Sequence, residues 1–269
     1  MNGICVSHNV FVRSHMMDVR IRRELVLELL HRKGRVTVSE VSALTEVSEM
    51  TVRRDLETLE REGALKRVHG GAISAVSTSY EPPFAIRARR AGEAKERIGR
   101  EAAKLLREGE TVILDVGTTT LEVARSLRGR RNLTVLTPSL RAAEVLADEP
   151  GIRLMVTGGV VRAGERSLVG DYAEHSFSEL RFDTFVMGVG GIEAEAGLTE
   201  FNPDDARVKR AALGSAQRCL VSADSSKFGR VAFARICPLE EVDVLVTDAQ
   251  AAPDDLAPIE AADVEVIRA

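Results

Sequence analysis

Cysteine is scarce in this sequence of 269 residues, and its scarcity excludes two classes of protein. The three cysteines, Cys5, Cys219 and Cys237, are widely separated, and no two of them are spaced as Cys-x-x-Cys. An odd number of widely spaced cysteines argues against a disulfide framework and against a zinc site, and it is typical of a reducing cytosol. The sequence therefore predicts a cytoplasmic protein without a cysteine-bound zinc ion, and we see no motif that calls for another metal ion or a cofactor.

Long apolar runs are also missing. No stretch approaches the roughly 18–20 uninterrupted apolar residues that a membrane span needs. Residues 1–16 contain neither the apolar core nor the small-residue cleavage site of a signal peptide, and they show no helix or strand periodicity. We expect no contact with a membrane, and we expect residues 1–16 to be a disordered extension in front of a start at Met16 or Met17.

An excess of positive charge is the third missing feature, since the formal net charge is −4. The segment from Met17 to Ile73 is close to neutral, with 11 basic and 10 acidic residues. Any affinity of this segment for nucleic acid must come from the way its charges are arranged on faces, because their sum supplies no attraction.

Hydrophobic periodicity predicts three helices between residues 17 and 73. Apolar residues recur at helical spacing over residues 21–30, and Gly34 is expected to end that first helix. Ser39 is expected to cap a second helix, because a serine hydroxyl accepts a hydrogen bond from a free N–H group of the first turn. Ser48 is expected to cap the third helix in the same way, and Gly63 to terminate it.

The third helix has the composition of a DNA recognition helix. If Val52, Leu56 and Leu59 face the core, the first turns expose a mixed polar and basic face. Arginine pairs with two acceptors of guanine, and hydroxyl groups bind phosphates or bases. The predicted DNA contacts on this helix are Ser48, Met50, Thr51, Arg53 and Arg54.

Residues 64–73 follow as a basic hairpin with a Gly-Gly turn, which is typical of the wing of a winged helix-turn-helix. Lys66, Arg67 and His69 would reach backbone phosphates from this wing. The alternative is a small packing module whose arginines are only solvated. We favour DNA binding because two capped helices, paired arginines and a basic hairpin occur together, in the order that this fold needs.

Residues 74–92 are expected to form a solvated linker, since Pro82 and Pro83 forbid helix and favour extended chain. From residue 93 to 269, strand-like and helix-like runs alternate, which predicts an α/β domain with a largely parallel open sheet. The predicted strands are residues 111–115, 133–137, 153–157, 184–188, 219–223 and 242–247. The predicted helices are residues 94–107, 121–127, 139–147, 173–180 and 206–216.

Two glycine clusters follow predicted strands, where ligands of open sheets bind. The first is Gly117-Thr118-Thr119-Thr120 after Asp115, and it combines a turn, three hydroxyls and a helix N-terminus into a candidate anion site. A simple capped turn is an equally open interpretation. The second cluster, at Gly188, Gly190 and Gly191, would allow either a close approach to a ligand or tight strand–helix packing. Further candidates at the same edge are Glu200, Lys209, Asp224 and Lys227.

The helix-turn-helix segment resembles the DNA-binding signature of the DeoR family of bacterial regulators. The matching stretches are Arg22-x3-Val26-x3-Leu30, Ser48-Glu-Met-Thr51-Val-Arg53-Arg54-Asp55-Leu56, Leu59-x3-Gly63 and Lys66-Arg-Val-His-Gly-Gly-Ala72. The resemblance implies that Thr51, Arg53 and Arg54 lie against operator DNA. We expect Asp55 to orient an arginine or to cap locally, because phosphate would repel its carboxylate.

The rest of the chain resembles the C-terminal domain of the same family. The matching stretches are Leu114-Asp-Val-Gly-Thr-Thr-Thr120, Gly158-Gly159, Ser167-Leu-Val-Gly-Asp171, Phe182-Asp183, Gly188-Val-Gly-Gly-Ile192, Gly197-Leu-Thr199, Lys209-Arg210, Ala223-Asp-Ser-Ser-Lys-Phe-Gly229 and Val242-Asp243. The resemblance implies a fold similar to ribose-5-phosphate isomerase and glucosamine-6-phosphate deaminase, and an effector that is a sugar phosphate or a related metabolite.

The same resemblance implies roles for individual residues. Thr118, Thr119 and Thr120 would hold the phosphate, Asp115 and Glu200 would bind hydroxyls, and Lys209 would contact the anionic ligand. One departure is visible at Thr137-Pro138-Ser139, where many members have Thr-Asn-Ser. Proline has no side-chain amide, so a ligand contact made by that asparagine is absent here.

The sequence thus predicts a transcriptional repressor of carbohydrate metabolism with no catalytic residues. Its partners would be double-stranded operator DNA, a phosphorylated sugar that releases it, and further copies of the chain in a homodimer or homotetramer. The alternative is a sugar-phosphate isomerase or deaminase that carries a DNA-binding module. No pairing of histidine with a carboxylate occurs in the candidate loops to favour this alternative.

Overall fold

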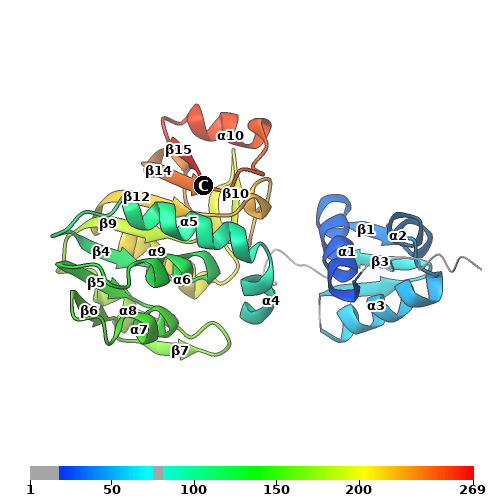
Figure 1. Cartoon of the computed structure of the whole chain (residues 1–269), viewed down its shortest axis with the longest axis horizontal. Coiled ribbons are helices and arrows are strands. Elements are labelled where there is room, and N and C mark those ends of the chain that lie inside the picture. Colours follow the sequence, from blue (N-terminus) through cyan, green and yellow to red (C-terminus); the bar gives the residue numbers. More distant parts are fainter. Residues whose placement is uncertain (1–17, 63, 75–80) are drawn as a thin grey trace, which may run out of the picture. The chain divides into compact units, whose positions relative to one another are not determined.

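The computed structural model describes residues 18–62, 64–74 and 81–269, and it divides into two compact units (Figure 1). The division lies between Ser77 and Thr78. Three of the predictions, an extension at residues 1–16, a helix end at Gly63 and the first part of the linker, fall wholly or partly outside the described residues. Each unit has its own buried apolar core.

The first unit is a winged helix-turn-helix, as the sequence predicts. Three helices surround the buried apolar residues, and a small antiparallel sheet with the strand order β1-β3-β2 completes the unit. The elements are α1 (Val19–Lys33), β1 (Arg35–Thr37), α2 (Val38–Thr45), α3 (Glu49–Arg61), β2 (Leu65–Val68) and β3 (Gly71–Ser74).

Helix boundaries in the first unit follow capping chemistry. Gly34 ends α1 with a φ of 70°, and the Ser48 side chain accepts a hydrogen bond from the Thr51 N–H group at the start of α3, so both predictions are confirmed. The predicted cap at Ser39 is wrong. Thr37 caps α2, because its extended backbone places its Oγ1 3.1 Å from the Glu40 N–H group, and Ser39 then falls inside the helix.

The wing depends on two adjacent glycines. Gly70 turns the chain with a φ of 77°, a conformation that glycine adopts without steric cost. At Gly71 a Cβ atom would lie 2.0 Å from the carbonyl oxygen of Val36, so the close contact between β3 and β1 requires a residue without a side chain. The pair therefore fixes both the turn of the wing and its attachment to β1.

The second unit is built on a seven-stranded sheet in which every strand is parallel to its neighbours (Figure 1). All six predicted strands belong to this sheet, which confirms the α/β class, and the last strand, β15, was not predicted. The strand order is β15-β14-β12-β9-β4-β5-β6. The strands are β4 (Thr111–Leu114), β5 (Leu133–Thr137), β6 (Ile152–Val156), β9 (Phe182–Met187), β12 (Ala216–Ser222), β14 (Val244–Thr247) and β15 (Glu265–Arg268).

Alternating side chains of the strands supply two cores, one on each face of the sheet. Val112 and Leu114 join one core together with residues of α5, α6 and α7, and Ile113 joins the other core with α8, α9 and α10. The helices are α5 (Gly92–Lys104), α6 (Thr118–Ser126), α7 (Leu140–Leu146), α8 (Asp171–His175), α9 (Pro203–Leu213) and α10 (Pro253–Glu260). Of the five predicted helices, that at 173–180 is shorter and earlier, and that at 121–127 begins earlier, at Thr118.

Two small antiparallel elements were not predicted. One is the hairpin of β7 (Val160–Arg162) and β8 (Ser167–Val169). The other is a three-stranded sheet of β10 (Gly191–Glu193), β11 (Gly197–Glu200) and β13 (Ala234–Cys237). These strands lack the continuous apolar runs by which buried parallel strands are recognised in a sequence. Two short 3₁₀ turns, Ser225–Lys227 and Leu239–Glu241, complete the second unit.

The expectation of an extended, solvated linker over residues 74–92 is wrong for its second half. Helix α4 (Phe84–Arg89) begins directly after Pro83, and α5 starts already at Gly92. A proline is compatible with a helix start because its missing N–H group would have no partner there. The Pro83 carbonyl oxygen accepts hydrogen bonds from the N–H groups of Ile86 and Arg87, which holds the first turn of α4.

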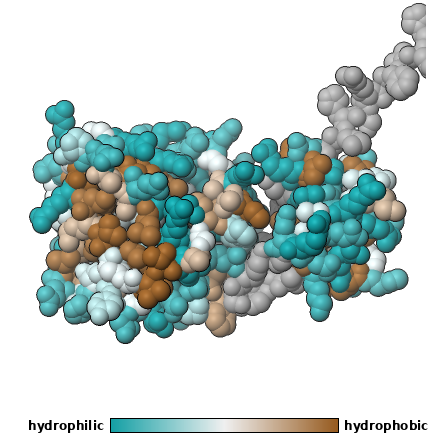
Figure 2. Space-filling model, turned by 90° about the horizontal axis from the view of Figure 1, so that it is seen from below, coloured by the Kyte–Doolittle hydropathy of each residue, from teal (hydrophilic) through white to brown (hydrophobic). Residues whose placement is uncertain are grey.

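Apolar side chains gather on one face of the second unit (Figure 2). Exposed residues of this kind at the β6 edge of the sheet include Val156, Val160 and Val161. Exposed apolar patches are typical of surfaces that contact another protein. Among the described residues, no helix is both long enough and apolar enough to cross a lipid bilayer.

Candidate nucleic-acid interface and anion pocket

Helix α3 has a buried face that packs against the core and an exposed face. Val52, Leu56 and Leu59 are buried in the core of the first unit. The predicted DNA contacts Ser48, Met50, Arg53 and Arg54 are exposed, and Thr51 is half-buried. The first turn of α3 thus presents one apolar, one hydroxyl and two guanidinium side chains on one accessible surface.

The charges on this surface are held loosely. Arg53 pairs with Glu49 of the preceding turn at 3.2 Å, and both side chains are about half exposed, so the pair contributes about 0–1 kcal/mol. Ser48 Oγ lies 2.9 Å from Thr51 Oγ1 while it caps the helix. Because exposed pairs are weak, Arg53 can exchange Glu49 for a phosphate or a base at little cost.

Asp55 does not belong to this surface. Its carboxylate is buried and accepts hydrogen bonds from Arg22 Nε at 2.5 Å and from Arg23 Nε at 3.0 Å, both on α1. The prediction that Asp55 orients an arginine is confirmed. This buried cluster fastens α3 to α1 and fixes the orientation of the exposed face.

The wing is fastened to α3 through Arg67. The Arg67 guanidinium lies 2.9 Å from the Glu57 carboxylate, and its backbone N–H group donates to Glu60 Oε1 at 2.9 Å. Lys66 and His69 are exposed, and within the described residues no hydrogen bond or ion pair engages their side chains. All three predicted wing contacts are therefore exposed, and Arg67 also holds the wing in place.

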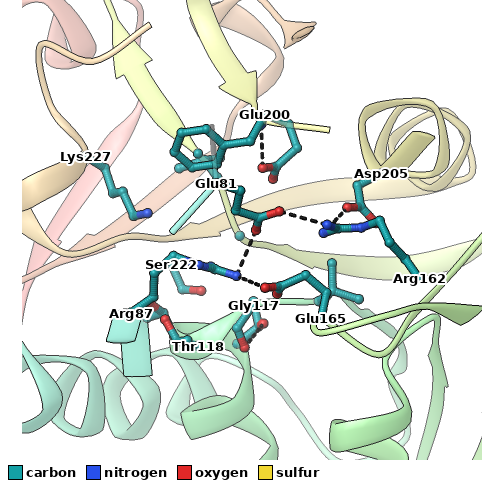
Figure 3. Close-up of a pocket in the computed structure, with 17 residues that line it drawn as sticks. Glu81, Arg87, Gly117, Thr118, Arg162, Glu165, Glu200, Asp205, Ser222 and Lys227 are labelled. Atoms are coloured by element: carbon teal, nitrogen blue, oxygen red, sulfur yellow. Dashed lines mark hydrogen bonds and ion pairs between the residues drawn. The ribbon is translucent and has the colours of Figure 1, made fainter. Parts of the chain in front are cut away.

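A pocket in the second unit lies where the order of the parallel strands reverses. From β4 the chain continues through β5 to β6 on one side, and from β9 through β12 to β14 and β15 on the other. Ligands of open α/β sheets bind at the carboxyl ends of the strands at such a reversal. The lining residues are Glu81, Arg87, Val116, Gly117, Thr118, Thr119, Thr120, Arg162, Glu165, Gly188, Val189, Gly190, Glu200, Phe201, Asp205, Ser222 and Lys227 (Figure 3).

One wall of the pocket is the N-terminus of α6. Gly117 precedes the helix with a φ of 143°, and no side chain caps the free N–H groups of the first turn, which is formed by Thr118, Thr119 and Thr120. The Thr120 hydroxyl donates to the Gly117 carbonyl oxygen at 3.2 Å and so stabilises the turn itself. The uncapped N–H groups and the helix dipole make this wall favourable for an anion.

The glycines of the second cluster differ in role: two of them line the pocket, and the third allows tight packing of the chain. Gly188 and Gly190 line the pocket, and a Cβ atom at either position would lie 3.0 Å from a backbone carbonyl oxygen. Gly191 lies outside the lining, where a Cβ atom would come within 2.2 Å of the Arg230 carbonyl oxygen. For Gly191 the requirement is therefore tight packing against the chain at Arg230.

Behind the glycines lies a buried ion cluster of Asp115, Glu200 and Lys209. The Lys209 ammonium contacts the Asp115 carboxylate, donates to the Gly188 carbonyl oxygen at 2.9 Å, and lies 3.3 Å from Glu200 Oε2. Burial disfavours the charged ammonium, but Asp115 and Glu200 outweigh it and raise the pKa of Lys209 above its usual value. Asp115 accepts a further hydrogen bond from the Gly188 N–H group at 2.9 Å.

Of these three, only Glu200 reaches the pocket lining. Lys209 is 1% exposed, and its three N–H groups are accounted for by Asp115, Gly188 and Glu200. A direct contact between Lys209 and a ligand would therefore require one of these partners to be given up. In this structure, Lys209 and Asp115 position Gly188 and Glu200.

The two remaining predicted residues, Asp224 and Lys227, form a second charged group beside the pocket. Asp224 is buried, and Lys95 lies 3.6 Å from its carboxylate, while Lys227 lines the pocket. Burial lowers the pKa of Lys227 to about 7, which Asp224 only partly offsets. Burial acts to raise the pKa of Asp224, but the charges of Lys227 and Lys95 and hydrogen bonds from Ser226 outweigh it, so that this pKa is lowered.

Sequence reasoning missed six polar residues of the pocket, namely Glu81, Arg87, Arg162, Glu165, Asp205 and Ser222. They come from α4 and its approach, the β7–β8 hairpin, α9 and the end of β12. Five of them form one network of ion pairs. The sixth, Ser222, is 1% exposed, and its hydroxyl has no hydrogen-bond partner among the described residues, so it is available to a ligand.

No group of three or more histidine, cysteine, aspartate or glutamate side chains within the described residues has the arrangement of a metal site. If all its charged side chains are ionised, the pocket lining holds four carboxylates and three cations. The lining thus offers carboxylates that accept hydrogen bonds and an uncapped helix N-terminus that attracts negative charge.

Comparisons with known proteins agree with this division of the chain. Residues 22–78 match a family model described as the DeoR-like helix-turn-helix domain, and residues 90–249 match one described as the DeoR C terminal sensor domain. The glycerol-3-phosphate regulon repressor of Escherichia coli K12 is 33% identical over 85% of this chain and 90% of its own length. The HTH-type transcriptional repressor GlcR of Bacillus subtilis is 35% identical over 83% of this chain and 86% of its own length.

Among solved structures, the chain is similar over part of its length to ribose 5-phosphate isomerase A from Methanocaldococcus jannaschii. It is 18% identical, with a TM-score of 0.39 over 51% of this chain and 54% of that protein.

Proposed function

This chain belongs to the DeoR family of transcriptional regulators, and from that premise we propose that it is a repressor of carbohydrate-metabolism genes released by a phosphorylated sugar. The observation that carries the proposal is the pocket at the strand reversal, where an uncapped helix N-terminus faces carboxylates in a chain that also has a winged helix-turn-helix. The relatives named above, a glycerol-3-phosphate regulon repressor and the repressor GlcR, support it.

DNA recognition is assigned to residues 17–73. Arg53 and Arg54, with Met50 and Thr51, would meet base edges in the major groove, and Lys66, Arg67, His69 and Ser48 would meet phosphates. A two-fold symmetric operator needs two such units, so we propose a homodimer or a homotetramer as the active form.

Effector binding is assigned to residues 93–269 together with the approach to α4. The free N–H groups and hydroxyls of Thr118 and Thr119 would hold the phosphate, and Glu200 would accept hydrogen bonds from sugar hydroxyls. Asp115 and Lys209 would not contact the ligand themselves. They hold Glu200 and the turn at Gly188 in place. Lys227 would add a positive charge on the opposite side.

The experiment combines DNA binding with a ligand panel. Fluorescence anisotropy with a labelled fragment of the promoter upstream of the gene would give the operator affinity of the full chain at fixed salt. A thermal-shift panel of sugar phosphates would identify the effector, since a ligand at 100 times its dissociation constant adds about 2.7 kcal/mol to the stability. The proposal requires the stabilising sugar phosphate to release the DNA, and release by the unphosphorylated sugar alone would contradict it.

The same panel tests the enzymatic alternative. The relatives are regulators, so we expect ribose 5-phosphate and glucosamine 6-phosphate to be recovered unchanged after incubation with the protein. Turnover at the enzyme-like rates of about 1–1,000 per second would instead assign Glu81, Glu200 and Lys227 to acid–base chemistry.

A further inference from the structure

The Glu81 carboxylate occupies the middle of the effector pocket (Figure 3). One of its oxygens lies 2.8 Å from Arg87 Nη2, and the other lies 2.9 Å from Arg162 Nη1. Planar guanidinium groups that share a carboxylate in this way bind phosphate with the same geometry. Glu81 thus sits where two arginines of the pocket would receive an anion.

The other partners of these arginines come from elements with more attachments. Glu165 pairs with Arg87, and its backbone carbonyl oxygen accepts a hydrogen bond from Arg141. Asp205 pairs with Arg162 and belongs to the first turn of α9, which Asn202 caps. Glu81 lies outside any helix or strand, and among the described residues no backbone hydrogen bond involves it.

Charge balance sets a limit on what can enter the pocket. With all of its charged side chains ionised, its lining holds four carboxylates and three cations, so a phosphate group would add negative charge to a site with a slight excess of it. Repulsion between like charges at such distances costs several kcal/mol in a desolvated site. Burial already disfavours the charged form of Glu81 and raises the pKa of that carboxyl to about 7, although Arg87 lies beside it.

We propose that Arg87 and Arg162 belong to the phosphate-binding residues of the pocket, and that Glu81 is an internal carboxylate which a phosphorylated ligand displaces. This inference rests on the proposed function and deepens it, because it names the residue that competes with the effector. On displacement Arg87 and Arg162 exchange the Glu81 carboxylate for the phosphate, and the number of anions that they hold stays the same.

Displacement would act on the segment that leads to the DNA-binding unit. The far end of α4 is anchored, because the buried Lys95 ammonium donates to the carbonyl oxygens of Arg87 at 2.5 Å and Arg90 at 2.7 Å. Ahead of α4 the chain is held by the Glu81 ion pairs and by a hydrogen bond from Arg87 Nε to the Pro82 carbonyl oxygen at 2.9 Å, while Phe84 in the first turn packs against the core. Glu81 follows residues 75–80 directly in the chain. Ligand binding would therefore release Glu81 and loosen the approach to α4, on the side that is closer in sequence to the first unit.

The first experiment measures the binding of inorganic phosphate to the full chain by calorimetry, for wild type and for Glu81→Gln. Glutamine keeps the size of the side chain and removes the competing charge, so the variant is expected to bind phosphate about tenfold more tightly. The matched control is Glu93→Gln, an exposed glutamate on α5 that does not line the pocket, and its affinity should equal that of wild type.

Two further measurements separate competition from a general change of charge. In the Glu81→Gln background, Arg162→Gln should reverse the gain in affinity, because the guanidinium that Glu81 had engaged is then missing. Hydrogen exchange of the α4 amides in wild type should rise when phosphate saturates the pocket. In Glu81→Gln the exchange should be high already and should not respond to phosphate.

Equal phosphate affinity in wild type and Glu81→Gln, absence of binding in both, or unchanged exchange of α4 would each overturn the inference. Those outcomes leave the proposed function intact as long as a sugar phosphate releases operator DNA. If no sugar phosphate releases DNA while Glu81→Gln still binds phosphate more tightly and α4 responds, the proposed effector is wrong and the role of Glu81 stands.

Discussion

The exposed face of α3 and the pocket of the second unit both carry arginines, but they hold them in opposite ways. Arg53 is half exposed and has one weak partner within its own helix. Arg87 and Arg162 are mostly buried and are shared among Glu81, Glu165 and Asp205, which come from distant parts of the chain. A solvated arginine can change partners freely, whereas a buried one exchanges a partner only when another anion replaces it.

This contrast has a functional meaning for a regulator. A DNA-reading surface must scan many sequences, so its charges are best left available to whichever phosphate or base is nearest. A sensor must couple occupancy to structure, so its charges are best committed to protein partners that a ligand has to replace. The four predictions that follow test the contrast, from the largest expected effect to the smallest.

The largest effect is expected for the buried charges, when Lys209 is replaced. Lys209→Met keeps the aliphatic chain and removes the ammonium, which leaves the carboxylates of Asp115 and Glu200 buried without a counter-charge. We expect the free energy of unfolding of the second unit to fall by about 3–5 kcal/mol, measured by urea denaturation at pH 7. The control Lys66→Met, on the exposed wing, should stay within about 0.5 kcal/mol of wild type.

The next largest effect is expected for the exposed arginines of α3, when Arg53 is replaced. Arg53→Ala should weaken specific operator binding by about 1–3 kcal/mol, because a guanidinium that pairs with a base is lost, while the unfolding midpoint stays unchanged. Anisotropy at matched salt measures the first quantity and thermal unfolding the second. Arg61→Ala, in the last turn of the same helix, is the control and should keep wild-type affinity. Equal affinity of Arg53→Ala and wild type would remove Arg53 from the interface.

A smaller effect is expected at the first turn of α6. Thr119→Val preserves the shape of the side chain and removes a hydroxyl that lines the pocket. The sugar phosphate that stabilises wild type most should bind this variant about tenfold more weakly, since one hydrogen bond to a charged group is lost. Thr134→Val on β5, outside the pocket lining, should leave the affinity unaltered. A loss of the same size at both positions would point to a general loss of stability.

The smallest effect is expected on the wing. Lys66→Ala should weaken binding to specific and nonspecific DNA by the same small factor, because a contact with phosphate carries no sequence information. The slope of log affinity against log salt should fall by about 0.9, the value for one neutralised phosphate. A change in the ratio of specific to nonspecific affinity would instead place Lys66 against a base.

The alternation of strands and helices along the main sheet and the first turn of α3 could be predicted from the sequence. Buried parallel strands are continuous apolar runs, and Ser48 is a strong local signal for a helix start, so both depend on neighbours in the chain. The N-cap of α2 was harder to predict, since Thr37 and Ser39 both carry a hydroxyl that can cap a helix. Only the extension of β1 to Thr37 decides between them.

The ion-pair network of the pocket could not be predicted, because its members are far apart in the sequence. Glu81, Arg162 and Asp205 meet only after the β7–β8 hairpin and α9 have packed against the sheet, and none of them lies in a motif. The proline pair beside Glu81 favoured a solvated linker instead. At Gly191 a glycine alone allowed two interpretations, and only the position of the Arg230 carbonyl oxygen distinguishes them.

The position of Asp55 on the inner side of α3 has a consequence for how such regulators diversify. The clamp of Asp55 onto Arg22 and Arg23, which orients the helix, uses a buried residue of α3, whereas Met50, Arg53 and Arg54 are exposed. Exchanging those outer side chains for the ones that a paralogue carries should transfer operator preference while leaving thermal stability untouched. New binding specificities can therefore arise by single substitutions, with no compensating change in the scaffold.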